Sequence, residues 1–188
     1  MLSSKGFKKV LNMAGGIRAW DNPMAVGSEE LGLTLFDGDD TPQQTLKTAY
    51  SLEAGLGDFY KLLGTRVAQK PIQELFDKLS HIEIKHQDRL FNEYVRVSNK
   101  QIDRESFDTQ IEKSALEGGL TTQEYLDLFK PDLSSAVDVV SLAMSIEAQA
   151  LDLYTRASEQ AGDENSRKVL QTIAHEEQTH LELLGHLL

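Results

Sequence analysis

Apolar residues recur at alternating steps of three and four along most of the chain after residue 42, a spacing typical of helices packed in a bundle. This pattern predicts four long helices, over residues of about 42–63, 71–98, 133–160 and 165 to the C-terminus. The segment between the second and third helices, residues 99–132, carries two shorter helical pieces at Ser106–Leu116 and Thr121–Leu128. Only Val10–Met13 resembles a strand, so the predicted fold class is all-α.

The beginnings of two helices carry cap signals. Thr41 and Pro42 are predicted to be the N-cap and the first residue of the first helix, since proline lacks a donor that is unpaired there anyway. Asp132 or Ser134 is the expected cap of the third helix. Residues 1–40 differ from the rest because they hold 6 of the 13 glycines, so we divide the chain into a short irregular appendage (1–40) and a helical bundle (41–188).

The two halves of the predicted bundle repeat each other. The segment Ala49–Tyr60 resembles Ala143–Tyr154, and the segment His81–His86 resembles His175–His180, both at an offset of 94 residues. Because the offset is shared, the first and second helical hairpins are copies in register. A site formed between such copies is expected to have approximate two-fold symmetry.

Six ionisable side chains interrupt the apolar stripes at positions related by this repeat. They are Glu53, Glu83, His86, Glu147, Glu177 and His180. Within each pair three residues apart, glutamate and histidine share one helix face. Four buried carboxylates would repel one another, and an unpaired buried carboxylate is strongly unfavourable. The pattern therefore predicts a site for two divalent cations rather than core polar groups satisfied by hydrogen bonds alone.

The predicted ligands are carboxylate oxygen and imidazole nitrogen without sulfur, a set that suits iron or manganese and tolerates zinc. Six side chains for two metals imply bridging carboxylates and open coordination positions. Tyr60 and Tyr154 lie two helical turns after Glu53 and Glu147, where they either hydrogen-bond metal-bound carboxylates or serve as core aromatics. Glu176 and Lys85 are interpreted as surface charge.

Composition excludes several other classes. The chain of 188 residues has a formal net charge of −11, which argues against a nucleic-acid or anionic-membrane partner. It contains no cysteine, so these residues hold no disulfide, no thiolate metal site and no cysteine nucleophile. No uncharged apolar run approaches the length of a membrane span. These features lead us to expect a cytoplasmic protein.

The repeated glutamate and Glu-x-x-His pattern resembles the ferritin-like superfamily, and within it the rubrerythrin-type proteins, over residues of about 42–188. The resemblance implies a four-helix bundle with a long crossover between the second and third helices. It also implies two metal ions per chain, iron in the first place, held by the six residues named above. Glu83 and Glu177 would be the bridges between the metals.

Two features differ from the rubrerythrin pattern. Rubrerythrin carries an additional glutamate at the position of Ala150, which lets one iron change ligands during turnover. It also carries a cysteine-ligated rubredoxin domain, which this cysteine-free sequence does not contain. An electron donor for a redox reaction would therefore be external.

Residues of about 1–22 carry a second resemblance. The run Gly15-Gly16-Ile17-Arg18-Ala19-Trp20 is similar to the closing segment of a rhodanese domain. The active-site loop of that family, with its cysteine, is absent from this sequence, so no rhodanese activity is expected. This segment is expected to be the remnant of a rhodanese–ferritin-like fusion.

Three functions are compatible with these features. The first is a dinuclear-metal oxidoreductase that reacts with hydrogen peroxide or dioxygen. The second is iron binding and storage without turnover, as in ferritins. The third is a structural metal-binding bundle attached to a rhodanese domain. A homodimer is expected because two-fold pairing is the commonest symmetric assembly.

Overall fold

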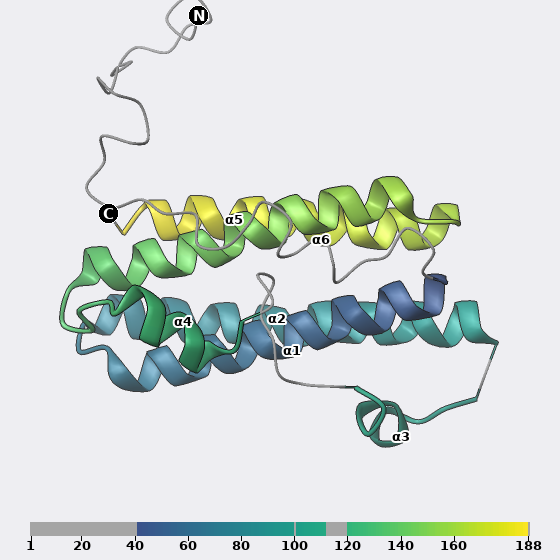
Figure 1. The fold of residues 1–188 in the computed structure, drawn as a ribbon, viewed down its shortest axis with the longest axis horizontal. Coiled ribbons are helices and arrows are strands. Elements are labelled where there is room, and N and C mark those ends of the chain that lie inside the picture. Colours follow the sequence, from purple (N-terminus) through teal and green to yellow (C-terminus); the bar gives the residue numbers. More distant parts are fainter. Residues whose placement is uncertain (1–40, 100, 112–119, 188) are drawn as a thin grey trace, which may run out of the picture.

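The computed structural model describes residues 41–99, 101–111 and 120–187, and this part of the chain contains six helices and no strand. The helices are α1 (Pro42–Arg66), α2 (Lys70–Ser98), α3 (Arg104–Asp108), α4 (Thr122–Phe129), α5 (Ala136–Gln160) and α6 (Glu164–Gly185), shown in Figure 1. The possible strand Val10–Met13 and the rhodanese-like segment lie outside the described residues. None of the described helices combines the length and apolarity needed to span a membrane.

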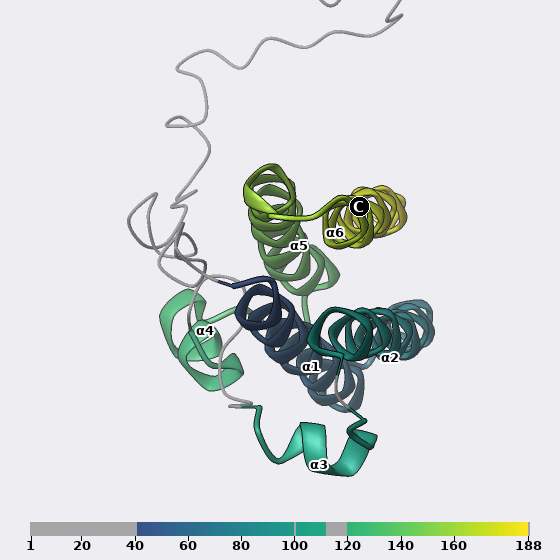
Figure 2. The ribbon, with the colours of Figure 1, turned by 90° about the vertical axis from the view of Figure 1, so that its right-hand side faces the viewer.

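The four long helices form two antiparallel hairpins, α1 with α2 and α5 with α6. Viewed from one end, the hairpins lie one above the other, and α2 also approaches α6 (Figure 2). The short helices α3 and α4 belong to the long connection between α2 and α5 and lie outside the four-helix arrangement (Figures 1 and 2). The predicted all-α bundle with a crossover between its second and third long helices is confirmed.

The cap predicted for the first long helix is present, and the cap predicted for the third is wrong. The Thr41 side chain accepts a hydrogen bond from the backbone N–H of Gln44, whose own side chain accepts one from the backbone of Thr41, a complete capping box. The cap of α5 is Ser135, which accepts from the backbone N–H of Asp138. Asp132 instead accepts from the backbone and hydroxyl of Ser134, 2.9 and 2.6 Å away, and so forms the turn before the helix.

The crossover is anchored to the bundle by aromatic side chains. Phe107 of α3 is completely buried and packs edge-on against Tyr50 of α1, with ring centroids 4.9 Å apart at 88°. Arg104 donates to the Tyr50 hydroxyl at 2.7 Å. In α4 the buried Tyr125 donates to the side chain of Gln149 at 2.6 Å. These contacts hold the connection against α1 and α5.

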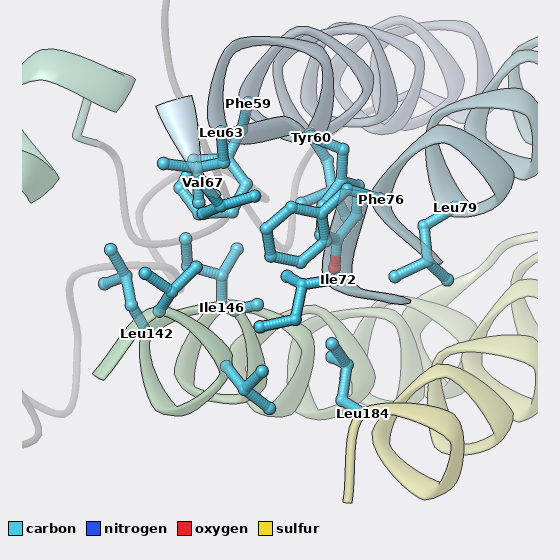
Figure 3. Close-up of a cluster of buried hydrophobic side chains, with 14 of the residues drawn as sticks. Phe59, Tyr60, Leu63, Val67, Ile72, Phe76, Leu79, Leu142, Ile146 and Leu184 are labelled. Atoms are coloured by element: carbon cyan, nitrogen blue, oxygen red, sulfur yellow. The ribbon is translucent and has the colours of Figure 1, made fainter. Parts of the chain in front are cut away.

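Two apolar clusters fill the interior. The first, which we call the Leu63 cluster, spans Leu56–Leu63 of α1 and includes Leu142 and Ile146 of α5, as Figure 3 shows. The second, the Leu46 cluster, spans Leu46–Leu52 at the other end of α1. Glu53 lies between the two clusters along α1, so a polar layer crosses the middle of an otherwise apolar core.

Candidate metal centre

Each long helix contributes at least one ionisable side chain to this middle layer. The layer contains all six residues that the sequence singled out, namely Glu53 from α1, Glu83 and His86 from α2, Glu147 from α5, and Glu177 and His180 from α6. The most exposed of them, His180, retains only 2 % of its accessible surface. The alternating steps of three and four place these side chains on the same inward faces as the core leucines.

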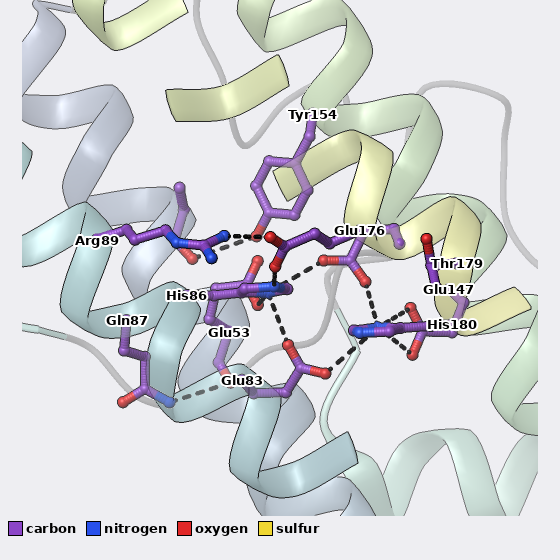
Figure 4. A network of polar contacts seen from close by, with 12 residues as sticks. Glu53, Glu83, His86, Gln87, Arg89, Glu147, Tyr154, Glu176, Thr179 and His180 are labelled. Atoms are coloured by element: carbon purple, nitrogen blue, oxygen red, sulfur yellow. Dashed lines mark hydrogen bonds and ion pairs between the residues drawn. The ribbon is translucent and has the colours of Figure 1, made fainter. Parts of the chain in front are cut away.

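The first group of side chains surrounds the imidazole of His86. Its Nδ1 lies 3.0 Å from Oε2 of Glu53, 2.9 Å from Oε2 of Glu83 and 3.3 Å from Oε1 of Glu177. One ligand atom from each of these four residues lies within 4.8 Å of all the others. Figure 4 shows Glu53 and Glu83 next to the ring of His86. We call this group the His86 cluster.

The second group surrounds His180 in the same way. Its Nδ1 lies 2.9 Å from Oε2 of Glu177, 3.3 Å from Oε1 of Glu147 and 3.6 Å from Oε1 of Glu83. These four residues also offer one ligand atom each within 4.8 Å of one another. We call this group the His180 cluster. The two imidazole rings stack with centroids 5.7 Å apart at 13°, so the clusters are neighbours related by the sequence repeat.

The carboxylates of Glu83 and Glu177 belong to both clusters. Glu83 directs Oε2 toward His86 and Oε1 toward His180. Glu177 directs Oε1 toward His86 and Oε2 toward His180. Each of these carboxylates therefore presents one oxygen to each cluster, the arrangement needed to bridge two cations.

Several of the buried oxygens have no hydrogen-bond partner among the residues that the structure describes. They are Oε1 of Glu53, both carboxylate oxygens of Glu83 and both of Glu177. A single imidazole Nδ1 carries at most one proton, so it cannot satisfy the three carboxylates that face it. Buried acceptors of this kind are costly unless a cation or a proton compensates them. The donor set of carboxylates and imidazoles therefore fits a pair of divalent metal ions.

Without a cation, bound protons neutralise part of the negative charge of these buried carboxylates. Burial and the neighbouring Glu177 carboxylate raise the pKa of Glu83 well above its ordinary range, and the same two causes raise the pKa of Glu147 to about 8. Burial opposes protonation of His180, but its hydrogen bond with Glu147 and its close contact with the Glu177 carboxylate outweigh burial and raise the pKa of His180 to about 11. A metal ion bound by the His180 cluster would therefore displace protons from these groups.

The pKa of Glu177 shifts in the opposite direction from those of Glu83 and Glu147. Burial disfavours its charged form, but the close imidazoles of His180 and His86, 2.9 and 3.3 Å from its oxygens, outweigh burial and hold its pKa well below the ordinary range. Carboxylates that face each other at close range commonly divide in this manner, one ionised and one protonated. Glu177 is therefore the carboxylate that stays charged between the two imidazoles.

The two repeated tyrosines are both buried, and the hydroxyl of each donates a hydrogen bond to the other hairpin. The buried hydroxyl of Tyr60 donates to Oε1 of Glu147, so this tyrosine touches a carboxylate of the His180 cluster from the opposite hairpin. The Tyr154 hydroxyl donates to the main-chain carbonyl of Ala49 at 3.3 Å. Each of the repeated tyrosines therefore links the two hairpins through its hydroxyl group.

One residue of the site was missed, because the interpretation of Glu176 as surface charge is wrong. Its Oε2 lies 2.7 Å from Nε2 of His86, and its Oε1 accepts from Nη1 of Arg89 at 2.5 Å. The hydrogen bonds with His86 and Arg89 lower the pKa of Glu176 to about 2. The sequence signal is a break in the repeat, since the residue 94 positions before Glu176 is the apolar Ile82. Lys85 is exposed, as expected.

Two helical hairpins around a buried layer of carboxylates and imidazoles define a ferritin-like helical bundle. The family model for rubrerythrin matches residues 44–188, and the chain therefore belongs to the rubrerythrin family. Comparison with curated proteins and comparison with solved structures each gave no match. Membership of the family suggests a di-iron site, and the two clusters described above are the groups suited to hold metal.

Proposed function

We propose that this protein binds two iron ions in the polar layer and acts as an oxidoreductase that reduces hydrogen peroxide or dioxygen. The observation that carries the proposal is the position of Glu83 and Glu177, each with one oxygen in each cluster. Manganese suits the same donor set, and zinc is tolerated. Family membership supports iron.

The six buried side chains divide naturally between two ions. Glu53 and His86 would bind the ion of the His86 cluster, and Glu147 and His180 the ion of the His180 cluster. Glu83 and Glu177 would bind both ions. Two ferrous ions held by these residues would supply the two electrons that, with two protons, reduce one hydrogen peroxide molecule to two water molecules.

The surrounding residues orient the ligands and keep bulk water away. The Leu63 and Leu46 clusters close the polar layer at both ends of the bundle. Tyr60 holds its hydroxyl proton against Oε1 of Glu147 and so fixes the orientation of that carboxylate. Repeated turnover requires an external one-electron donor to return the site to its reduced state.

Ala150 favours a second candidate function, iron binding and storage without repeated turnover. Ala150 is completely buried one helical turn after Glu147, where the rubrerythrin pattern has a glutamate that changes its attachment to iron. A methyl group cannot take that role. The site would then hold one fixed set of ligands through oxidation.

Anaerobic reconstitution with ferrous iron separates these functions. An oxidoreductase will oxidise its iron rapidly on mixing with hydrogen peroxide and will consume many equivalents of peroxide when an artificial donor is supplied. Glu83→Ala should abolish this turnover, whereas Glu182→Ala on the exposed face of α6 should not. Uptake of iron far beyond two ions per chain without peroxide turnover would support storage. Retention of zinc that iron cannot displace would support a structural role instead.

A further inference from the structure

The two clusters differ in the contacts of the imidazole nitrogen Nε2, which faces away from the clustered carboxylates. Nε2 of His86 points away from the carboxylates of its cluster and meets Oε2 of Glu176 at 2.7 Å. Glu176 is in turn held by Arg89, one turn after His86 on α2, at 2.5 Å. Figure 4 shows Arg89 reaching across to Glu176, which lies against the ring of His86. Arg89, Glu176 and His86 thus form a chain of hydrogen bonds between α2 and α6.

The sequence repeat does not provide a matching carboxylate and arginine beside His180. At the offset of 94 residues, the counterpart of Glu176 is Ile82 and the counterpart of Arg89 is Leu183. Both members of the charged pair are thus replaced by aliphatic residues. Within the described part of the chain, no hydrogen bond is formed to Nε2 of His180. The inner contacts of the two imidazoles are similar, so the asymmetry lies in this outer layer.

A carboxylate at Nε2 changes how an imidazole binds metal. An imidazole that binds through Nδ1 must carry its proton on Nε2, and a carboxylate acceptor at Nε2 fixes this tautomer and the rotation of the ring. The acceptor also increases the basicity of the metal-binding nitrogen. Arg89 keeps Glu176 in place, since a guanidinium–carboxylate contact is directional. Loss of such an outer partner typically lowers metal affinity by about 10- to 100-fold.

We propose that the Arg89–Glu176 pair positions His86 and makes the His86 cluster the tighter of the two metal positions, so that it fills first. This inference rests on the proposed dinuclear site and not on its redox activity. Glu176 and Arg89 are positioning residues, because they act on the metal through His86. The half-exposed ion pair by itself would contribute little. Its effect comes from the buried imidazole that it holds, which has no accessible surface.

Titration of the metal-free full-length chain with cobalt(II) tests this inference. Calorimetry should resolve two binding steps in the wild-type chain. Crystals loaded with one cobalt per chain should give the stronger anomalous peak in the His86 cluster. Glu176→Ala should weaken the first step by about 10- to 100-fold and leave the second unchanged. Glu176→Gln should have a smaller effect, because its amide oxygen still accepts from Nε2.

Three further variants sharpen the test. Glu182→Ala, which removes an exposed carboxylate from the same helix, should leave both steps unchanged. Arg89→Gln should weaken the first step less than Glu176→Ala. The double variant Ile82→Glu with Leu183→Arg places the pair on the opposite side and should strengthen the second step. Thermal unfolding of each metal-free variant identifies any that fail to fold.

The outcomes separate the inference from the function on which it rests. Equal anomalous peaks in the wild-type chain would overturn the inference, and so would a Glu176→Ala variant in which the first step is unchanged or both steps weaken equally. In each of these cases two cobalt ions still bind, so the dinuclear site stands. A wild-type chain that takes up no cobalt would overturn both.

Discussion

Glu83 and Glu177 lie between the same two imidazoles although they come from different helical hairpins. Glu83 approaches His86 at 2.9 Å and His180 at 3.6 Å, while Glu177 approaches His180 at 2.9 Å and His86 at 3.3 Å. The two carboxylates therefore join the clusters into one unit that ties α2 to α6. Removal of either carboxylate should affect both metal positions together.

Glu177→Ala is expected to lower bound metal below two ions per chain. The wild-type fold should be stabilised by its metal, by about 2.7 kcal/mol for each site at free metal concentrations 100-fold above Kd. The variant should lose much of this stabilisation because neither position keeps its shared ligand. Elemental analysis and thermal unfolding with and without metal measure both effects. Glu182→Ala is the matched control, and an unchanged metal content in Glu177→Ala would reject the bridging role.

The stability of the metal-free protein should fall as pH rises from about 5.5 to about 8.5. Glu147 has a folded-state pKa of about 8, above its ordinary value, so its stabilising contribution is complete at acidic pH and is lost as pH rises through about 8. His180, with a folded-state pKa of about 11, adds a decline that begins near neutral pH. Urea unfolding across this range measures the slope.

The metal-loaded protein provides the control for this pH dependence. Bound cations replace the protons of Glu147 and His180, so the loaded protein should not show the same decline toward alkaline pH. Calorimetric titration in buffers of different ionisation enthalpy should detect proton release on metal binding at neutral pH. A metal-free protein whose stability rises with pH across this range would contradict the assigned protonation states.

Tyr60→Phe removes the hydroxyl that donates to Glu147 while keeping the aromatic ring in the core. We expect two metal ions per chain to remain and the affinity of the His180 cluster to fall by about tenfold. Tyr94→Phe, a buried tyrosine of the Leu46 cluster, is the control. Equal effects of the two substitutions on metal affinity would show that Tyr60 acts only as a core aromatic.

Most of the bundle could be predicted from the sequence because its helices bury regular stripes. The repeated Glu-x-x-His pattern, together with the repeated glutamates Glu53 and Glu147, also indicated all six residues of the polar layer, since each lies on a stripe that otherwise contains core residues. The cap of α5 was missed because Asp132, Ser134 and Ser135 are all good cap residues, and only the turn geometry selects among them.

Glu176 could not be placed from the pattern of one helix. It directly precedes Glu177, so it projects about 100° away from the buried stripe of α6. Whether such a flank faces solvent or a neighbouring helix depends on how the hairpins pack, and α2 lies there with His86 and Arg89. In the sequence, the only indication that Glu176 has a special role is that its counterpart in the repeat is the apolar Ile82.

Phe107→Ala should destabilise the protein without emptying the metal site. Phe107 is completely buried against Tyr50, Phe91 and Tyr94, so truncation should cost about 3–5 kcal/mol in the free energy of unfolding. Metal content should stay at two ions per chain because α3 lies outside the polar layer. Leu128→Ala, at a side chain that is 49 % exposed, should have little effect on either quantity. Loss of metal in Phe107→Ala would contradict the separation of crossover and site.

Ala150→Glu introduces a carboxylate one helical turn after Glu147 in α5. We expect the metal content to stay at two ions per chain, with peroxide turnover equal to or higher than that of the wild-type chain. Elemental analysis and the peroxide assay check both expectations. Ala150→Gln, which adds similar volume without charge, is the control. Loss of both metals in the glutamate variant alone would contradict the matching of Ala150 to the position of the additional rubrerythrin glutamate.

Anomalous diffraction from crystals of protein expressed in iron-replete cells tests the central claim most directly. We expect two iron peaks, one in the His86 cluster and one in the His180 cluster, with Glu83 and Glu177 between them. A single peak, or density for the six side chains with hydrogen bonds in place of any metal, would contradict a dinuclear centre.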